Sequence, residues 1–343
     1  MVEGIQQGSF EIGADLMFEE ILPNLYRIEI PLPGSPLKAL NSYLIKGEGR
    51  FLLIDTGMNR EECMGEMSTA LARLNVDLKK TDFFITHWHV DHLGLAGRLA
   101  TNTSTVYFNE VEASAINDIS RGEENWWGKI AAIYLANGFP VDELKISAQS
   151  HPGRRFGLKQ HLDFCILKEG DKIEIGDYSF RCIETPGHSP GHMCLYEANK
   201  KILVAGDHIL FDITPNIIFG PTMENSLKQY LASLDKVYTL DVNLVLPGHR
   251  SIMSDHRRRI RELKEHHRNR AKEALLALED GGKTAFQVAP FITWDIEYKS
   301  WELFPAQQKW FAFGETLAHL QYLEQERMVR EGRKEDKILF SLA

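Results

Sequence analysis

The segment Thr86–His92, of sequence THWHVDH, constrains this chain more than any other stretch. Three histidines and one aspartate follow Thr86 within six residues. Neutral imidazole and carboxylate groups are good ligands for zinc and similar divalent metals. An apolar run precedes the segment and a helical pattern follows it, which predicts a loop between a strand and a helix, where catalytic groups commonly gather. A polar surface loop that is merely rich in histidine is disfavoured, because matching residues recur further along the chain.

These matching residues lie at the ends of other predicted strands. His188 follows a strand within a loop that proline and glycine keep rigid, and Asp207 and His249 each follow a further strand. One histidine at a strand end is usually incidental, but a recurrence at four strand ends is hard to explain without a metal. Asp55 ends another strand, and we expect it either to cap the following turn or to support the histidine loop from behind.

The hydrophobic pattern predicts an α/β order of elements. Strands are expected at residues 25–30, 42–45, 51–54, 82–85, 105–108, 172–177, 178–184, 193–197, 201–205 and 242–246. Helices are expected near residues 59–74, 226–237, 255–278, 283–290 and 311–323, with a β-hairpin from 328 to 340. Residues 109–169 form a less sheet-like, helical insert whose aromatic residues either complete a core or wall the site.

Composition narrows the class of protein. The 343 residues carry a formal net charge of −9, so the chain as a whole does not suggest nucleic-acid binding. No run of 18 apolar residues predicts a membrane span, and the first residues lack the features of a signal peptide. The four cysteines are scattered without a CxxC pair, which indicates reduced thiols in a cytoplasmic protein.

Taken together, five motifs resemble the metallo-β-lactamase fold superfamily. They occur in the family's order, as LIDTG at 53–57, HxHxDH at 87–92, TPGH at 185–188, AGDH at 205–208 and PGH at 247–249. The resemblance implies a four-layer αβ/βα sandwich with its site at one edge of two sheets. It also implies a dinuclear centre: His87, His89 and His188 would bind the first metal, Asp91, His92 and His249 the second, and Asp207 would bridge them. Class B1 β-lactamases carry cysteine at the position of Asp207, so this chain is expected to be a different dinuclear hydrolase.

The C-terminal residues extend the resemblance to the lactamase-beta-like group, whose catalytic domain is followed by a small winged-helix domain. We therefore expect a catalytic domain at 1–253 and a mostly helical winged-helix-like domain at 254–343. Residues 257–272 carry eight Lys or Arg against two Glu, a stripe that could bind phosphate. The alternative is a solvated helix face balanced by the acidic remainder.

The expected function is hydrolysis of a small carboxylic ester, thioester or lactone by a metal-bridging hydroxide, with Asp91 accepting a proton as well as binding metal. Zinc is the first choice of metal, with iron or manganese as alternatives. His208 is expected to support the site beside Asp55, and the substrate pocket is expected to include Trp126, Trp127, Tyr134, Phe211 and Phe219. The expected partner is a small acyl substrate, and the sequence does not decide whether the chain forms a homo-oligomer. The competing hypotheses are an endoribonuclease acting on single-stranded RNA and a binding protein that kept the fold without the chemistry.

Overall fold

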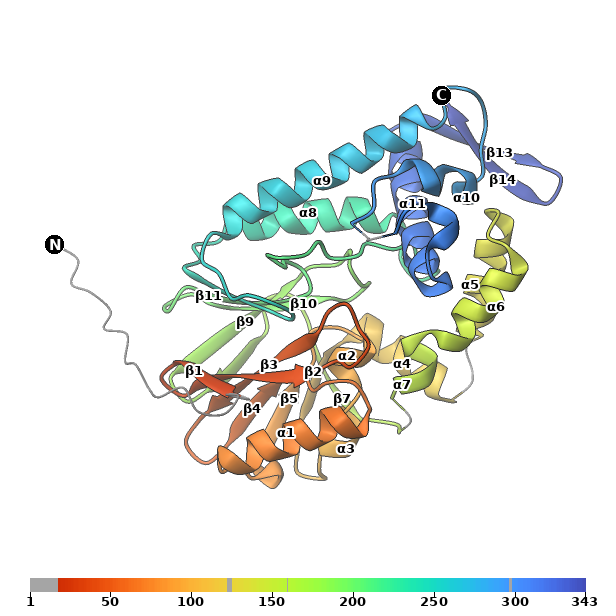
Figure 1. Ribbon diagram of the computed structural model, residues 1–343. Helices are drawn as coiled ribbons and strands as arrows, with labels where there is room; N and C mark the ends of the chain where they lie inside the picture. The colour runs from red at the N-terminus through yellow and green to blue at the C-terminus, as the bar shows by residue number, and fades with distance from the viewer. Residues whose placement is uncertain (1–17, 122–124, 159, 296–297) are drawn as a thin grey trace.

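Two mixed β-sheets face each other in the computed structural model, which describes residues 18–121, 125–158, 160–295 and 298–343 (Figure 1). The first sheet has the order β1-β2-β3-β4-β5-β6-β7, and the second has the order β12-β11-β10-β9-β8. The strands of the first sheet are β1 Phe18–Leu22, β2 Leu25–Pro31, β3 Ala39–Lys46, β4 Phe51–Ile54, β5 Thr81–Phe84, β6 Val106–Asn109 and β7 Phe164–Leu167. Those of the second are β8 Lys172–Ile175, β9 Tyr178–Glu184, β10 Met193–Glu197, β11 Ile202–Gly206 and β12 Leu244–Pro247.

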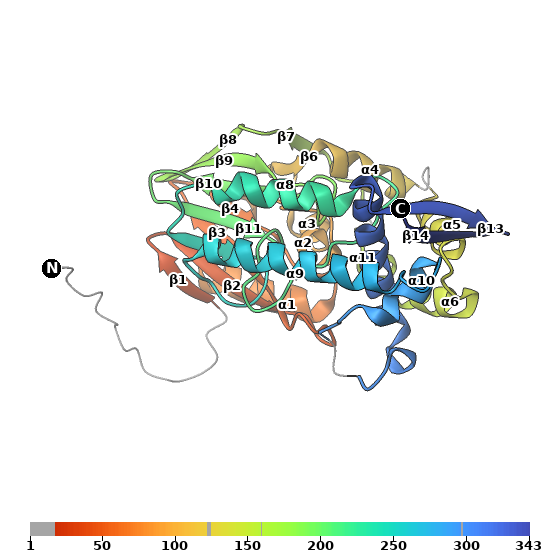
Figure 2. The same cartoon turned by 90° about the horizontal axis from the view of Figure 1, so that it is seen from above.

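Helices cover the outer sides of both sheets and form a separate group at one end. The helices are α1 Glu61–Arg73, α2 Val90–Leu93, α3 Ala96–Leu99, α4 Glu110–Arg121, α5 Trp126–Ala136, α6 Val141–Ser150, α7 Pro152–Phe156, α8 Ser226–Tyr238, α9 His256–Leu276, α10 Ala285–Val288 and α11 Ala306–Gln325. Short 3-10 helices span Leu78–Lys80, Ala289–Phe291 and Trp301–Leu303. Seen from above in Figure 2, α8 and α9 run side by side over the second sheet.

Three apolar cores fill the spaces between adjoining layers. Alternating residues of β2 and β3 point either to α1, as Ile28 and Leu44 do, or to the opposite sheet, as Leu25 and Tyr43 do. A third core joins the outer face of the second sheet to α8 and α9. The order is therefore helix, sheet, sheet, helix, which is the metallo-β-lactamase arrangement expected from the sequence.

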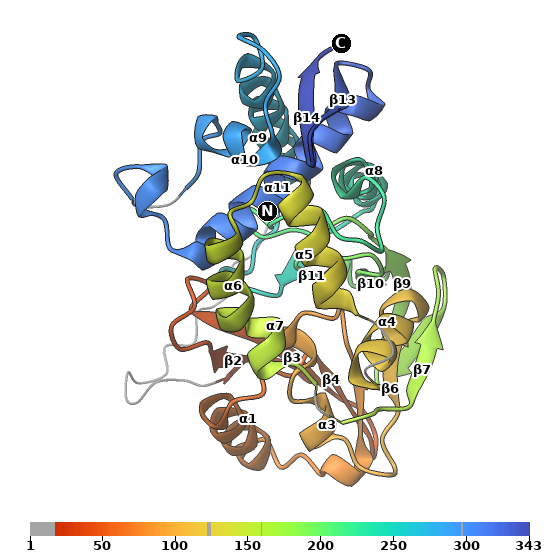
Figure 3. The ribbon, with the colours of Figure 1, turned by 90° about the vertical axis from the view of Figure 1, so that its right-hand side faces the viewer.

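A fourth core joins the insert to the C-terminal residues. Tyr134 and Phe139, which lie at the end of α5 and just after it, pack with Trp310 and Phe313 of α11. The hairpin of β13 (Val329–Lys334) and β14 (Lys337–Leu342) closes the same core, to which Phe340 contributes. Figure 3 shows α5 and α6 beside α11. The insert and the C-terminal helical and hairpin region thus share one interior at the edge of the sandwich.

The predicted strands and long helices are confirmed, with two differences in the first sheet. Strand β1 was not predicted, and it pairs antiparallel with β2. Strand β7 lies inside the segment 109–169 that was expected to be helical, and it pairs in parallel with β6. Phe164–Leu167 is too short a run to distinguish a strand from part of a helix by its pattern alone. Among the described residues, none of the helices has the length and apolar character needed to cross a membrane.

Candidate metal centre

The ends of five strands carry the predicted ligands and their support to one edge of the two sheets. Two glycines make this convergence possible. Gly187 has φ +140°, and a Cβ there would lie 2.4 Å from Cα of Tyr230 on α8. A Cβ at Gly248 would lie 2.4 Å from Oδ1 of Asp207. The loops can therefore approach one another only because these positions lack a side chain.

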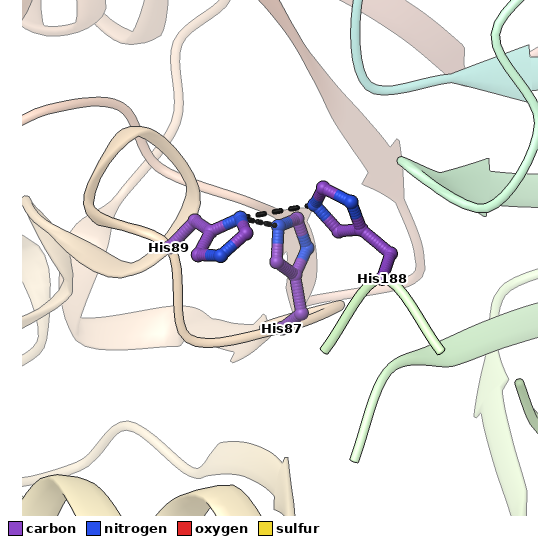
Figure 4. Close-up of side chains that lie close together, drawn as sticks. All are labelled: His87, His89 and His188. Carbon is purple, nitrogen blue, oxygen red and sulfur yellow. Dashed lines mark hydrogen bonds between the residues drawn. The ribbon is translucent and has the colours of Figure 1, made fainter. Parts of the chain in front are cut away.

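The first group consists of His87, His89 and His188. Nδ1 of His89 lies 2.9 Å from Nε2 of His87 and 3.0 Å from Nε2 of His188. Figure 4 draws these two contacts as dashed lines. The three ring nitrogens face one point and could hold one metal ion. The two chain segments that contribute them come from different sheets, after β5 and after β9.

The second group consists of Asp91, His92 and His249, which could hold another ion. Nε2 of His249 lies 3.5 Å from Oδ2 of Asp91. Asp207 contacts both groups: one carboxylate oxygen lies 3.5 Å from Nε2 of His92, and the other lies 3.6 Å from Nε2 of His188 and 3.5 Å from Nε2 of His249. The two triads implied by the resemblance thus come together around Asp207.

The imidazoles are held in the orientation that a metal ligand needs. In three of them Nδ1 lies within hydrogen-bond distance of an oxygen that only accepts: His92 with Asp55 Oδ2 at 2.7 Å, His188 with the carbonyl of Asn216 at 2.8 Å, and His249 with the carbonyl of Ala39 at 2.6 Å. Each Nδ1 therefore carries the proton and donates it, which leaves the lone pair on Nε2 in the neutral ring. Asp55 also accepts bonds of 2.8 Å from the backbone N–H and the hydroxyl of Thr86, just before the histidine cluster.

Burial keeps the first triad neutral in the metal-free chain. It lowers the pKa of His89 to about 3, with a further contribution from His188. The pKa values of His87 and His188 are lowered as well, in each case chiefly by burial. Neutral imidazole is the form that binds a metal, so these three side chains are ready to do so near neutral pH.

The second triad is charged instead. Burial opposes protonation of His249, but the carboxylates of Asp207 and Asp91 outweigh it and raise the pKa of His249 to about 10. The pKa of His92 is raised too, by Asp55 and Asp207 against the effect of burial. Burial would raise the pKa values of Asp91 and Asp207, but the two histidines outweigh it and hold them well below the usual range. The carboxylates that raise these two pKa values supply the negative charge that a cation at this point would neutralise.

The residues present fit a pair of divalent ions. Three atoms of the cluster are buried without a hydrogen-bond partner: Nε2 of His92, Nε2 of His249 and Oδ1 of Asp207. Such orphaned groups are costly unless something binds them. Two nitrogens bound about 2.1 Å from a tetrahedral ion lie about 3.4 Å apart. The pairwise separations given above, from 2.9 to 3.6 Å, are close to this spacing, and the ligand atoms of each triad all lie within 4.8 Å of one another.

Two buried residues outside the predicted set hold the ligand loops. Glu112 of α4 accepts bonds from the hydroxyl of Ser189 and the backbone N–H of Gly191, and the backbone of Trp88 bonds to it as well. It thereby ties the first histidine loop to the loop of His188. Burial raises its pKa to about 7 although these bonds lower it. No sequence signal could have found it, because an isolated acid on a helix usually faces solvent.

The second is His192, which is fully buried. Its Nε2 accepts a 3.1 Å bond from the backbone N–H of Asp207, and its Nδ1 lies 2.8 Å from the hydroxyl of Thr185. The hydroxyl of Thr185 must then accept from Nδ1–H, since Nε2 carries the lone pair. His192 therefore supports Asp207 from behind.

The 209–219 loop, which follows Asp207 and carries the carbonyl of Asn216 that orients His188, is clamped by the C-terminal helices. Arg259 of α9 donates to the carbonyls of Leu210 at 2.7 Å and Ile213 at 3.0 Å. At the other end of the loop, the N–H of Phe219 donates to the carbonyl of Gly314 on α11 at 3.0 Å.

Comparison with known proteins identifies the family. The model of the metallo-beta-lactamase superfamily matches residues 37–249. The chain belongs to this superfamily. The matched residues contain all seven predicted ligands, and with the histidine and aspartate clusters they confirm the prediction of a metallo-hydrolase.

Relatives in this superfamily extend over most of the chain. The probable metallo-hydrolase YqjP of Bacillus subtilis is 27% identical over 298 residues, which cover 84% of this chain and 88% of the relative. The acyl-coenzyme A thioesterase MBLAC2 of Bos taurus is 26% identical over 222 residues, covering 61% of this chain and 72% of the relative. The solved structure of a metallo-beta-lactamase family protein from Thermus thermophilus is 30% identical, with a TM-score of 0.80, and covers 94% of this chain and 100% of that protein.

A cavity of about 1390 Å³ opens onto the ligand cluster, and His89, Asp91, His188 and Asp207 line it. Its walls come from α4 and α5, from the 209–219 loop, and from α9 and α11. Trp126, Trp127, Tyr134 and Phe219, which the sequence suggested for the pocket, all line this cavity. A smaller hollow of about 370 Å³ beside α4 and β7 does not include the ligands.

Two more residues were expected from the sequence at the pocket or behind the site, and neither Phe211 nor His208 lines the cavity. Phe211 packs on the core between the second sheet and α8, because the loop turns where Arg259 binds its backbone. His208 is fully buried, and its ring centre lies 5.4 Å from that of Tyr230 and 6.1 Å from that of His192, so its support of the site stays a prediction. Its backbone carbonyl accepts a bond from the hydroxyl of Tyr230 at 2.9 Å.

The basic residues of α9 mostly have partners within the chain. Seven of them contact carbonyls, carboxylates or a hydroxyl: Arg257, Arg258, Arg259, Arg261, Lys264, Arg268 and Arg270. Arg270 lines the cavity, where it is buried, bonds to Glu315 and lies 4.5 Å from the ring centre of Trp294. Five of these seven side chains bond to other parts of the fold, whereas Arg258 and Arg268 bond to glutamates of α9 itself.

Proposed function

We propose that this protein is a dinuclear metal-dependent hydrolase of carboxylic acyl substrates, and that a thioester is its substrate ahead of an ester or a lactone. The observation that carries the proposal is the pair of buried ligand groups at the end of a large, mostly apolar cavity. The similarity to an acyl-coenzyme A thioesterase supports the choice of thioester.

In this proposal His87, His89 and His188 would hold one ion, Asp91, His92 and His249 would hold the other, and Asp207 would contribute its carboxylate to both groups. Two bound divalent ions lower the pKa of a water so that hydroxide is available near neutral pH. Asp91 keeps an ionised carboxylate at the cavity wall and accepts the proton of the attacking water. No serine or cysteine nucleophile is required. Nitrogen and oxygen ligands without thiolate suit zinc first, with iron and manganese as alternatives.

The charges around the cavity favour an acyl substrate over a phosphodiester. Among the described residues that line it, Arg270 is the one Lys or Arg side chain, and Glu315 already neutralises it. Phosphate recognition commonly uses several such cations. The free cysteines are consistent with the cytoplasmic location that we propose.

An endoribonuclease is the second candidate, supported by the order of α10, α11 and the β13–β14 hairpin, which resembles that of a winged helix. In that case the hairpin would contact RNA through Arg330 and Arg333, which are exposed. The engaged basic residues of α9 weigh against this candidate. A binding protein without chemistry is the third candidate, and the complete ligand set weighs against it.

The test is a substrate panel of acyl thioesters, esters, lactones and labelled single-stranded RNA, assayed with metal-loaded protein before and after treatment with a chelator. We expect thioester turnover that chelation removes and added metal restores. Turnover of RNA alone, lost when Arg330 and Arg333 are changed to glutamine, would overturn the proposal. Absence of turnover together with less than one metal per chain would favour the binding protein.

A further inference from the structure

One part of the cavity, the aromatic arm, is built by two helices that are far apart in the sequence. We define it by Trp126, Trp127 and Ile130 of α5 and by Trp310 and Phe311 of α11, all of which line the cavity. The helices are held against each other by the core that the insert and the C-terminal region share. The arm is therefore a formed feature of the fold and not a surface hollow.

The aromatic arm begins at the metal ligands. Trp88, the residue between His87 and His89, also lines the cavity, and its ring centre lies 5.1 Å from that of Trp126. Further along, Trp127 lies 5.0 Å from the ring of His151, which in turn lies 5.6 Å from both Trp310 and Phe311. A substrate chain that extends from the attacked carbonyl in this direction is in contact with aromatic side chains along its length.

Among the described residues, those that line the aromatic arm carry no charge near neutral pH. The titratable group among them is His151, whose pKa burial lowers to about 4, with a smaller effect from Arg154, which does not line the cavity but lies 5.3 Å from the ring centre of Trp127. The Nδ1 of His151 accepts a 3.1 Å bond from the backbone N–H of Gly153, as a neutral imidazole does. A charged substrate group here would lose its hydration without gaining a partner.

We propose that the aromatic arm binds the acyl group of the substrate, and that this group is a long, uncharged hydrocarbon chain. The inference rests on the proposed thioesterase function. The cavity volume of about 1390 Å³ exceeds the roughly 300–1,000 Å³ typical of sites for small ligands. A short acyl group would leave this apolar wall in contact with water, whereas a long chain would cover it.

The test is a chain-length series of N-acetylcysteamine thioesters from two to twelve carbons, with the released thiol measured by a colorimetric disulfide reagent. Burial of one methylene group favours binding roughly fourfold. We therefore expect kcat/KM to rise at least about tenfold between two and eight carbons. If kcat/KM stays flat or falls with chain length while the two-carbon substrate is hydrolysed, the aromatic arm does not bind the acyl chain, and the proposed thioesterase activity still stands. No turnover at any length would overturn the thioesterase proposal and this inference with it.

Ile130→Trp places a larger side chain in the arm and localises the effect. We expect the ratio of kcat/KM for twelve carbons over two carbons to fall at least about tenfold. The matched control is Ile146→Trp on α6, where the side chain is 57% exposed and does not line the cavity, and the ratio should be unchanged. An unchanged ratio in a folded Ile130→Trp would overturn the placement of the chain along α5. If thermal unfolding shows that this variant does not fold, Phe311→Trp tests the same arm from α11, with the same expected fall and the same contradicting result.

Discussion

Replacement of Arg259 by methionine should weaken both the fold and the metal site, although this arginine touches no predicted ligand. Arg259 donates to the carbonyls of Leu210 and Ile213 in the 209–219 loop, and its side chain is only 14% exposed. The same loop presents the carbonyl of Asn216 to Nδ1 of His188. Methionine keeps the aliphatic stem and removes the guanidinium, so the substitution removes these two hydrogen bonds together with a 3.2 Å contact to Glu262, a residue to which Arg258 also bonds.

The magnitude follows from the two contacts. A hydrogen bond from a charged donor contributes about 1.5–3 kcal/mol, and partial access of water to the freed carbonyls reduces the sum. We expect a loss of about 2–4 kcal/mol in the free energy of unfolding. Loss of a group that orients a ligand typically costs about 10–100-fold in metal affinity or activity, and we expect this range for Arg259→Met.

The assay compares urea unfolding of the metal-free protein and metal titration of the folded protein with those of Arg258→Met. Arg258 is the neighbour on the same helix; its side chain is 71% exposed and, in the described structure, bonds only to Glu262. An exposed pair of this kind contributes about 0–1 kcal/mol, so the control should remain close to the wild type. If Arg259→Met matched Arg258→Met in both measurements, the 209–219 loop would not be held as argued.

Three further substitutions test the centre from other sides. Asp55→Asn puts an amide N–H toward the donor Nδ1 of His92, so metal affinity measured by titration should fall about 10–100-fold; unchanged affinity would contradict this role. Gly248→Ala places a Cβ 2.4 Å from Oδ1 of Asp207, and the forced shift should cost about 1–3 kcal/mol in urea unfolding and reduce activity; a variant with wild-type stability would show that the loops have room. Glu112→Gln tests a pH dependence. The folded-state pKa of about 7 lies above the unfolded value, so the protonated form stabilises the fold and that contribution is lost as pH rises from about 4.5 through 7. The unfolding temperature of the variant minus that of the wild type should therefore be greater at pH 8 than at pH 5. If this difference does not change with pH, the raised pKa of Glu112 is contradicted.

Much of the sandwich could be predicted because its strands are short, apolar and separated by glycine-containing turns. The run 51–54 ending in Asp55 and the run 201–205 leading to Asp207 both became strands at the metal edge. Strand β7 could not be predicted, because four residues with neighbouring helices carry no clear period. Its strand character comes from pairing with β6, which is a tertiary contact.

The candidate ligands could be predicted because several chemically distinctive residues cluster in short motifs. The residues that hold the ligand loops in place could not be predicted. Glu112 acts through the loops of Trp88 and Ser189, which are distant in the sequence, and Arg259 appeared only as part of a basic stripe. The cavity was only partly foreseen for the same reason: its aromatic arm needs both the insert and α11, and no local pattern states that these two segments meet.

The most direct test of the central claim is the metal content of protein purified without chelator, measured by mass spectrometry beside thioester turnover. The account predicts two divalent ions per chain in the wild type. It predicts fewer ions and no turnover in Asp207→Ala, because this carboxylate lies 3.5–3.6 Å from ligand nitrogens of both triads. Two ions per chain in Asp207→Ala, or full turnover by metal-free wild type, would contradict it.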